Sequence, residues 1–199
     1  ERIGGIMWIK SLSTISGLIL MLMVTGCQSL GGQPAQVAIA DGRYQLQHSW
    51  PREPVQLWQK VEWKKGEQQR TFMVSAVFDS ERLLLVALSP FGNELFRSEL
   101  SRANGVTFKG SEAFDDSRLA MQVWSDLQMA LWPLDSINAN LSGVSLQATQ
   151  TGRELWRNGE LLWSSVSEDK NQQRVIQNKP MGYQLTITTL EYELLETNE

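Results

Sequence analysis

Few residues of this 199-residue chain have the type and spacing that catalysis needs. The only histidine is His48, and a Ser/His/Asp triad or a metal site would need partners far from it in the sequence. No cysteine, histidine and carboxylate cluster has metal-ligand spacing, and no nucleophile elbow or phosphate-binding glycine loop occurs. Asp115 and Asp116 could form a carboxylate pair, but adjacent aspartates before an apolar periodic stretch are more simply helix caps. The sequence therefore favours a protein that is not an enzyme and that carries no metal or cofactor.

The chemistry that the sequence does indicate is lipid attachment at the only cysteine, Cys27. An apolar run of about ten residues follows Lys10, which is too short for a transmembrane helix and typical of a signal peptide. Val24-Thr25-Gly26-Cys27 resembles the lipobox of bacterial lipoproteins, whereas a structural role for a lone cysteine would leave it without a disulfide partner. We expect residues 1–26 to be a signal peptide, with Met7 as the initiator, and Cys27 to be lipidated.

The residues after Cys27 indicate a location and a tether. In Gram-negative lipoproteins an aspartate after the cysteine favours retention in the inner membrane, so Gln28 implies the outer membrane, facing the periplasm. A cysteine that carries more than one acyl chain is anchored stably in a membrane. Small and polar residues, with Pro34, predict that residues 27–41 are the lipidated cysteine and a flexible tether. The net charge of −4 argues against a nucleic-acid partner.

Residues 42–199 are predicted to form one domain dominated by short strands. Apolar and polar residues alternate in segments such as 55–64 and 70–78, which is the period of a half-buried strand. Asn158-Gly159 lies between two apolar-containing runs and predicts a type I′ hairpin that pairs Arg157 with Glu160. Each of these patterns is typical of antiparallel pairing.

A single helix is expected to interrupt the strands. Its start is predicted at Asp115-Asp116-Ser117, apolar residues follow at helical spacing, and Pro133 ends it near Leu131. Residues 135–141 are expected to add a short helical turn. The predicted fold class is α+β, an antiparallel sheet that forms an open half barrel with a helix across it.

The chain also carries more apolar surface than a sheet face needs. Residues 82–88 are apolar on both parities, and Trp132 stands beside the helix-ending Pro133. Ser89-Pro90-Phe91-Gly92 is a β-turn that puts Phe91 at its tip. Two interpretations stay open: these side chains fill the core, or they line an apolar cavity and contact lipid.

Three segments resemble a known family: residues 83–96, residues 126–133 and the Asn158-Gly159 hairpin. They are similar to an uncharacterised family of Gram-negative lipoproteins that is often encoded beside aryl-polyene and fatty-acid-type biosynthesis genes. More distantly, they resemble LolB, the outer-membrane lipoprotein receptor, and its carrier LolA. The resemblance implies an open half barrel whose helices cover an apolar cavity.

The same resemblance implies a set of site residues. The turn at residues 89–92 is similar to a LolB turn whose exposed leucine takes part in membrane insertion, so Phe91 is expected to contact the membrane. The apolar residues implied to flank it, to line the cavity or to contact lipid are Leu84, Val86, Leu88, Leu95, Phe96 and Trp132. LolB has an N-terminal helix after its anchor, and residues 28–41 lack a helical period.

Together these features predict an outer-membrane lipoprotein that binds or transfers a hydrophobic acyl or lipid group. The alternative is a non-catalytic accessory subunit of an envelope assembly that uses exposed apolar side chains for protein contacts. A filled barrel with an apolar patch on its outer face would favour this second function.

Overall fold

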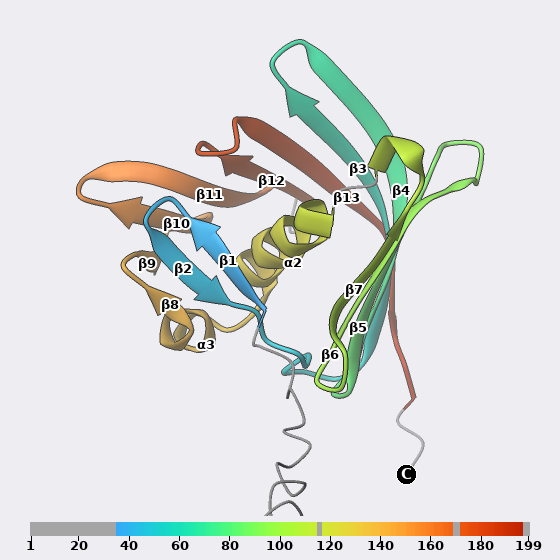
Figure 1. Cartoon of the computed structure of the whole chain (residues 1–199), viewed down its shortest axis with the longest axis horizontal. Coiled ribbons are helices and arrows are strands. Elements are labelled where there is room, and N and C mark those ends of the chain that lie inside the picture. Colours follow the sequence, from blue (N-terminus) through green and yellow to red (C-terminus); the bar gives the residue numbers. More distant parts are fainter. Residues whose placement is uncertain (1–34, 115–116, 169–171, 197–199) are drawn as a thin grey trace, which may run out of the picture. The chain divides into compact units, whose positions relative to one another are not determined.

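The computed structural model of the chain describes residues 35–114, 117–168 and 172–196 (Figure 1). The predicted signal peptide, Cys27, Asp115 and Asp116 lie outside the described residues. Within the described ranges the fold is mostly antiparallel strand with few helices. No helix of these ranges is long and apolar enough to cross a membrane.

Ten strands form one antiparallel sheet in the order β7-β6-β5-β4-β3-β13-β12-β11-β10-β9. Their bounds are β3 Val55–Lys65, β4 Gln68–Phe78, β5 Arg82–Leu88, β6 Glu94–Ser101, β7 Gly105–Gly110, β9 Ser145–Ala148, β10 Gly152–Arg157, β11 Glu160–Glu168, β12 Gln173–Asn178 and β13 Tyr183–Leu194. A second sheet has the order β1-β2-β8, with β1 Gln36–Ile39, β2 Gly42–Gln45 and β8 Leu141–Ser142. The helices are the 3₁₀ turn η1 Glu112–Phe114, α2 Ser117–Leu131 and α3 Leu134–Ala139.

The ten-stranded sheet curves around α2, which lies on its inner side (Figure 1). The edge strands β7 and β9 are at opposite ends of the strand order, so the sheet is open. The predicted alternation of β3 is confirmed, because Val55, Leu57 and Val61 are buried. A period of two places these side chains on one face of the strand, toward the interior.

The predicted hairpin at Asn158-Gly159 is confirmed. It joins β10 to β11 and pairs Arg157 with Glu160 and Trp156 with Leu161. Asn158 and Gly159 have φ angles of 48° and 80°. A type I′ turn needs positive φ at both central positions, and asparagine and glycine adopt it at the lowest cost.

The folded domain begins earlier than the sequence predicts. Residues 36–39 were expected within the flexible tether, but they form β1, which pairs with β2 from Gln36 to Ile39. Val37 and Ile39 are buried in the core. Their alternation with polar neighbours is too short to stand out from the small-residue composition around them, and pairing with β2 supplies the missing stability.

The centre of the core is aromatic and closely packed. The Trp50 and Trp132 ring centroids are 4.7 Å apart with an edge-to-face geometry, and the Phe78 and Trp124 centroids are 6.3 Å apart. Trp124 and Trp132 belong to α2 and to the residue after it, so this cluster fixes the helix against the fold. The helix ends at Leu131, as the position of Pro133 predicts.

Candidate lipid-binding cavity

A cavity of about 260 Å³ lies between α2 and the inner face of the sheet. Its wall is mostly apolar and draws on the helix and on the strands at the centre of the sheet. The lining residues of the sheet and of η1 are Gln59, Val61, Trp63, Arg70, Phe72, Val74, Leu85, Phe96, Phe114, Ile176, Tyr183, Leu185 and Ile187, and those of the helix are Leu119, Val123, Asp126 and Leu127. The helix therefore covers this part of the sheet without filling the space between them.

One polar contact holds α2 to the β6 side of the sheet. The indole Nε1 of Trp124 donates a hydrogen bond to Ser98 Oγ at 2.9 Å, and Ser98 Oγ donates to the Thr107 carbonyl at 2.9 Å. All three partners lie in β6, β7 or α2, and Trp124 and Ser98 are buried. A buried tryptophan needs a partner for its N–H, so this contact fixes the helix at a set height over β6.

A second polar contact holds the helix to the opposite side of the sheet through Asp126. Its Oδ1 accepts hydrogen bonds from Trp163 Nε1 at 3.0 Å and from Asn178 Nδ2 at 3.2 Å, and the Tyr183 hydroxyl donates to its Oδ2. Trp163 pairs with Asn178, and Asn178 pairs with Tyr183, across β11, β12 and β13. Three strands therefore present one row of donors to one carboxylate, and Gln122, one turn earlier in α2, adds a fourth at 3.1 Å.

Burial decides the protonation behaviour of this carboxylate. Burial raises the pKa of Asp126 to about 6, although the hydrogen bonds from Tyr183, Gln122, Asn178 and Trp163 each act to lower it. Burial also raises the pKa of Tyr183, and the adjacent Asp126 carboxylate raises it further. Asp126 is therefore predominantly ionised at neutral pH, and the Tyr183 hydroxyl keeps its proton.

The far end of α2 is fixed by contacts outside the cavity. Gln128 accepts hydrogen bonds from the Tyr44 hydroxyl at 2.8 Å and the Gln47 backbone N–H at 2.9 Å. Arg153 Nη1 donates to the Met129 carbonyl at 2.8 Å and to the Trp132 carbonyl at 2.6 Å. A cation on carbonyls at a helix C-terminus satisfies groups that the helix itself leaves without partners.

The cavity wall of β5 is formed by the parity that the sequence did not single out. Leu84, Val86 and Leu88, implied to flank Phe91, line the cavity or contact lipid, are half-buried and outside the wall, whereas Leu85 on the other parity lines it. Contact of the three with lipid stays a prediction. Both faces of this strand are apolar, so period-two reasoning gives no sign of which one points inward. Pairing with β4 decides it: Leu85 stands opposite the buried Ala76, on the inner face.

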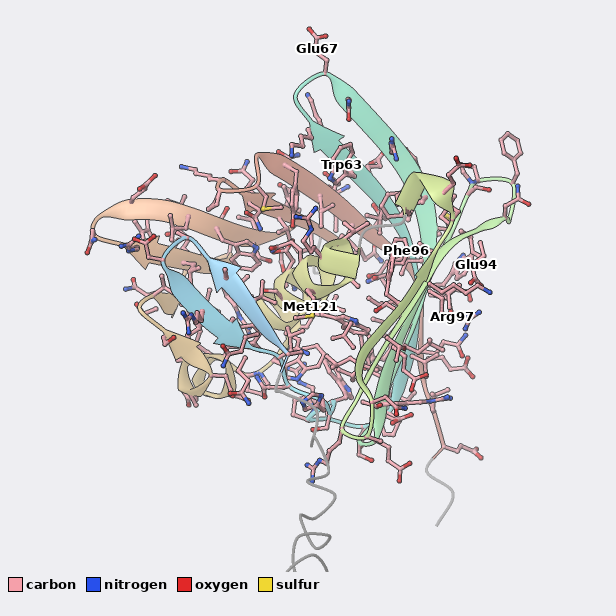
Figure 2. The ribbon with its side chains drawn as sticks, viewed as in Figure 1. Trp63, Glu67, Glu94, Phe96, Arg97 and Met121 are labelled. Carbon is pink, nitrogen blue, oxygen red and sulfur yellow. The ribbon has the colours of Figure 1, made fainter. Side chains whose placement is uncertain are left out.

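The two predicted residues of β6 also lie on opposite faces of their strand, and only one of them lines the cavity. Phe96 is buried and lines the cavity, and Figure 2 shows it on the α2 side of β6 with Arg97 on the other side. Leu95 is half-buried and is not part of the cavity wall. Trp132 is also outside the wall, because it is fully buried against Trp50 and donates its Nε1–H to the Ser49 carbonyl at 3.1 Å.

Phe91 protrudes from the β5–β6 turn, with 92% of its surface exposed. The Ser89 hydroxyl oxygen accepts hydrogen bonds from the backbone N–H groups of Phe91 and Asn93, and Gly92 has a φ of 85°. For Phe91, the structure excludes the interpretation that the side chain fills the core. Contact of Phe91 with a membrane stays a prediction.

The side chain of His48 lies away from the cavity wall. It is half-buried, and its Nδ1 has no hydrogen-bond partner among the described residues. Within the same residues, no group of three or more histidine, cysteine, aspartate and glutamate side chains could hold a metal ion. Among the described residues, the cavity wall carries no histidine, serine or cysteine, and its charged or ionisable side chains are Arg70, Asp126 and Tyr183.

Sequence reasoning missed Arg70, Asp126 and Tyr183 as residues of the cavity wall. Gln122 and Asp126 are four residues apart on the helix face that also carries apolar residues, and a polar pair on that face is a usable signal of a buried network. Asn178 and Tyr183 gave no such signal, because only strand pairing brings them together. Arg70 reads as an ordinary charged residue near a hairpin turn.

Comparisons with known proteins give one family and two solved structures. A family model described as "Protein of unknown function (DUF3261)" matches residues 56–191. A LolA superfamily protein from Nitrosomonas europaea is 7% identical, with a TM-score of 0.43, and the match covers 75% of this chain and 90% of that one. A DUF1329 family protein from Desulfovibrio piger is 12% identical, with a TM-score of 0.27, over 75% of this chain and 88% of that one. The comparison with curated proteins gave no match.

Proposed function

The chain belongs to the family described as "Protein of unknown function (DUF3261)". We propose that it binds or transfers a hydrophobic acyl or lipid group in the cavity under α2, without catalysis. The observation that carries this proposal is the mostly apolar wall between α2 and the sheet. A helix held by buried polar contacts at Ser98 and at Asp126 keeps this space open, because it cannot settle onto the sheet without breaking them.

The size and chemistry of the cavity support a ligand with one chain. Its volume of about 260 Å³ exceeds the ~150 Å³ apolar cavities that bind benzene, and lies just below the ~300–1,000 Å³ of drug-sized pockets. Burying apolar surface contributes about 25 cal/mol per Å². A single acyl chain therefore gains affinity from the wall itself, and needs few polar contacts.

We further propose that the protein acts at the outer membrane, facing the periplasm, with Cys27 as its lipid anchor. The lipobox-like residues and Gln28 support this location, and Cys27 lies outside the described residues. The test is Cys27→Ala in a Gram-negative host, followed by membrane fractionation. We expect the variant in the soluble or unprocessed fraction, and outer-membrane fractionation of the variant would refute the anchor.

The binding proposal is tested with N-phenylnaphthylamine, a neutral dye that fluoresces in apolar sites. The purified full chain should bind the dye and release it when dodecanol is added. Ile187→Trp places a large ring into the cavity from β13, and we expect it to abolish dye binding. Thr186→Trp is the matched control, because the adjacent residue is outside the cavity wall and should leave binding unchanged. Equal dye binding by both variants would contradict the proposal.

A second function, a protein contact within an envelope assembly, is favoured by the end of β13. Leu190, Tyr192 and Leu194 are 50%, 64% and 52% exposed, and the β12 pairing ends at Thr188. No described residue pairs with this edge of β13 beyond Thr189, and exposed apolar side chains on such an edge are suited to a partner strand. A photo-crosslinking residue at Tyr192 should then capture one discrete envelope protein in cells, and no discrete product would remove this function.

A further inference from the structure

Arg70 is a cation at the rim of the cavity. It is exposed, it lines the cavity, and it stands opposite Trp63 across the β3–β4 pair. Its guanidinium carbon lies 5.3 Å from the centroid of the Phe114 ring, which is also part of the wall. No carboxylate of the described residues forms an ion pair with it. An aromatic ring therefore positions this cation, which has no ion pair among the described residues.

A second cation lies near Arg70, at the same hairpin end and outside the cavity wall. Lys65 shares the parity of Val61 and Trp63 along β3, which places it on the cavity face of the hairpin. It pairs with Gln68, so it stands diagonal to Arg70, where Cβ atoms are about 7–8 Å apart. Figure 2 shows the nearby Glu67 at the tip of the hairpin, directed away from α2. The inner face of this hairpin end is cationic.

The opposite side of the cavity carries a negative charge that already accepts hydrogen bonds from neighbouring side chains. Asp126 lines the wall beside β12 and β13, and the strand order puts β13 two strands and β12 three strands from the β4 of Arg70. Four donors surround the Asp126 carboxylate. An anionic group placed beside Asp126 would meet a like charge whose four hydrogen-bond donors are already engaged.

We propose that the ligand is an anionic single-chain amphiphile, with a carboxylate or phosphate headgroup on Arg70 and Lys65 and its chain inside the cavity. This inference rests on the proposed function, since it names the class of ligand and its orientation in the same cavity. A guanidinium binds carboxylate and phosphate through paired N–H groups, and a headgroup at the exposed rim keeps part of its hydration. The reversed orientation would bury the anion in an apolar site beside Asp126.

The experiment compares headgroups on one chain length. Dodecanoate, dodecyl phosphate and dodecanol displace N-phenylnaphthylamine from the full chain, from Arg70→Gln and from Lys64→Gln. Lys64 is the matched control, because it is an exposed cation at the same end of β3 on the opposite parity. Displacement by dodecanol measures binding to the apolar cavity alone. Displacement by the two anions also measures binding of the headgroup at the rim, and comparing them distinguishes a carboxylate from a phosphate.

We expect Arg70→Gln to weaken the binding of at least one anion by about fivefold, which is the effect of losing a partly exposed ion pair with good geometry. The affinity for dodecanol should stay within about twofold of the wild-type value. Lys64→Gln should change none of the three, and 0.5 M salt should reduce the preference for the anions. Equal losses for dodecanol and the anions, or no loss for either anion, would overturn the inference. Failure of dodecanol itself to displace the dye would instead count against the proposed function.

Discussion

The two ends of α2 meet the rest of the fold in different ways. Toward and just after its C-terminus, Met129, Ala130 and Trp132 are at most 3% exposed, and the Trp132 ring packs against Trp50 and Phe78. Toward its N-terminus, Leu119 and Val123 face a cavity of about 260 Å³. Protein interiors are close-packed as a rule, so the cavity needs a cause. The comparison indicates that close packing and the polar contacts of Gln128 and Arg153 hold the C-terminal end of the helix. The polar contacts of Trp124 and Asp126 hold its middle above the sheet.

The largest effect should come from the packed end. Trp132→Ala removes a fully buried ring and its hydrogen bond to the Ser49 carbonyl, and we expect a loss of about 3–5 kcal/mol in the free energy of unfolding. Val123→Ala, at the cavity, should lose only about 1 kcal/mol because fewer contacts surround it. Urea unfolding followed by circular dichroism measures both. Similar losses in the two variants would break the comparison.

An effect on the order of 3 kcal/mol is expected from Asp126, and it depends on pH. Its pKa is raised from 3.8 to about 6, so the folded state holds this proton more tightly than the unfolded state. The contribution is therefore fully present below pH 3.8 and is lost as pH rises through about 6. Urea unfolding from pH 4 to pH 7 should show wild type losing stability relative to Asp126→Asn. A difference that stays constant, or that grows with pH, would contradict the assigned surroundings of Asp126.

The smallest effect on stability is expected at Phe91, which touches neither end of the helix. Phe91→Glu should change the free energy of unfolding by less than about 0.5 kcal/mol, because the ring is 92% exposed. It should also weaken sedimentation of the protein with phospholipid vesicles. A loss of several kcal/mol would show that the ring packs in solution, and unchanged sedimentation would remove the predicted membrane contact.

The sequence predicts the local elements well. The Asn158-Gly159 hairpin, the alternation of β3 and the end of α2 before Pro133 each depend on a few neighbouring residues, and the structure has all three. A turn with positive φ and a proline that ends a helix are local steric facts. Such features therefore need no knowledge of the rest of the fold.

The cavity wall is where sequence reasoning is weakest. On β5 the inner face includes Leu85, and the two apolar parities of residues 82–88 are indistinguishable until β4 pairs with the strand. The donors of Asp126 come from three strands and one helix. Their convergence is set by long-range pairing, which a pattern within one segment does not record. The exposed position of Phe91, by contrast, follows from its own turn.

The most direct test of the central claim is native mass spectrometry of the full chain purified from a Gram-negative host. The account predicts a co-purifying mass in the lipid range that is lost on denaturation, is retained by Thr186→Trp and is absent from Ile187→Trp. A ligand-free mass for wild type, unchanged after incubation with lipid extract, would contradict a binding cavity under α2. The exposed end of β13 would then be the better guide to function.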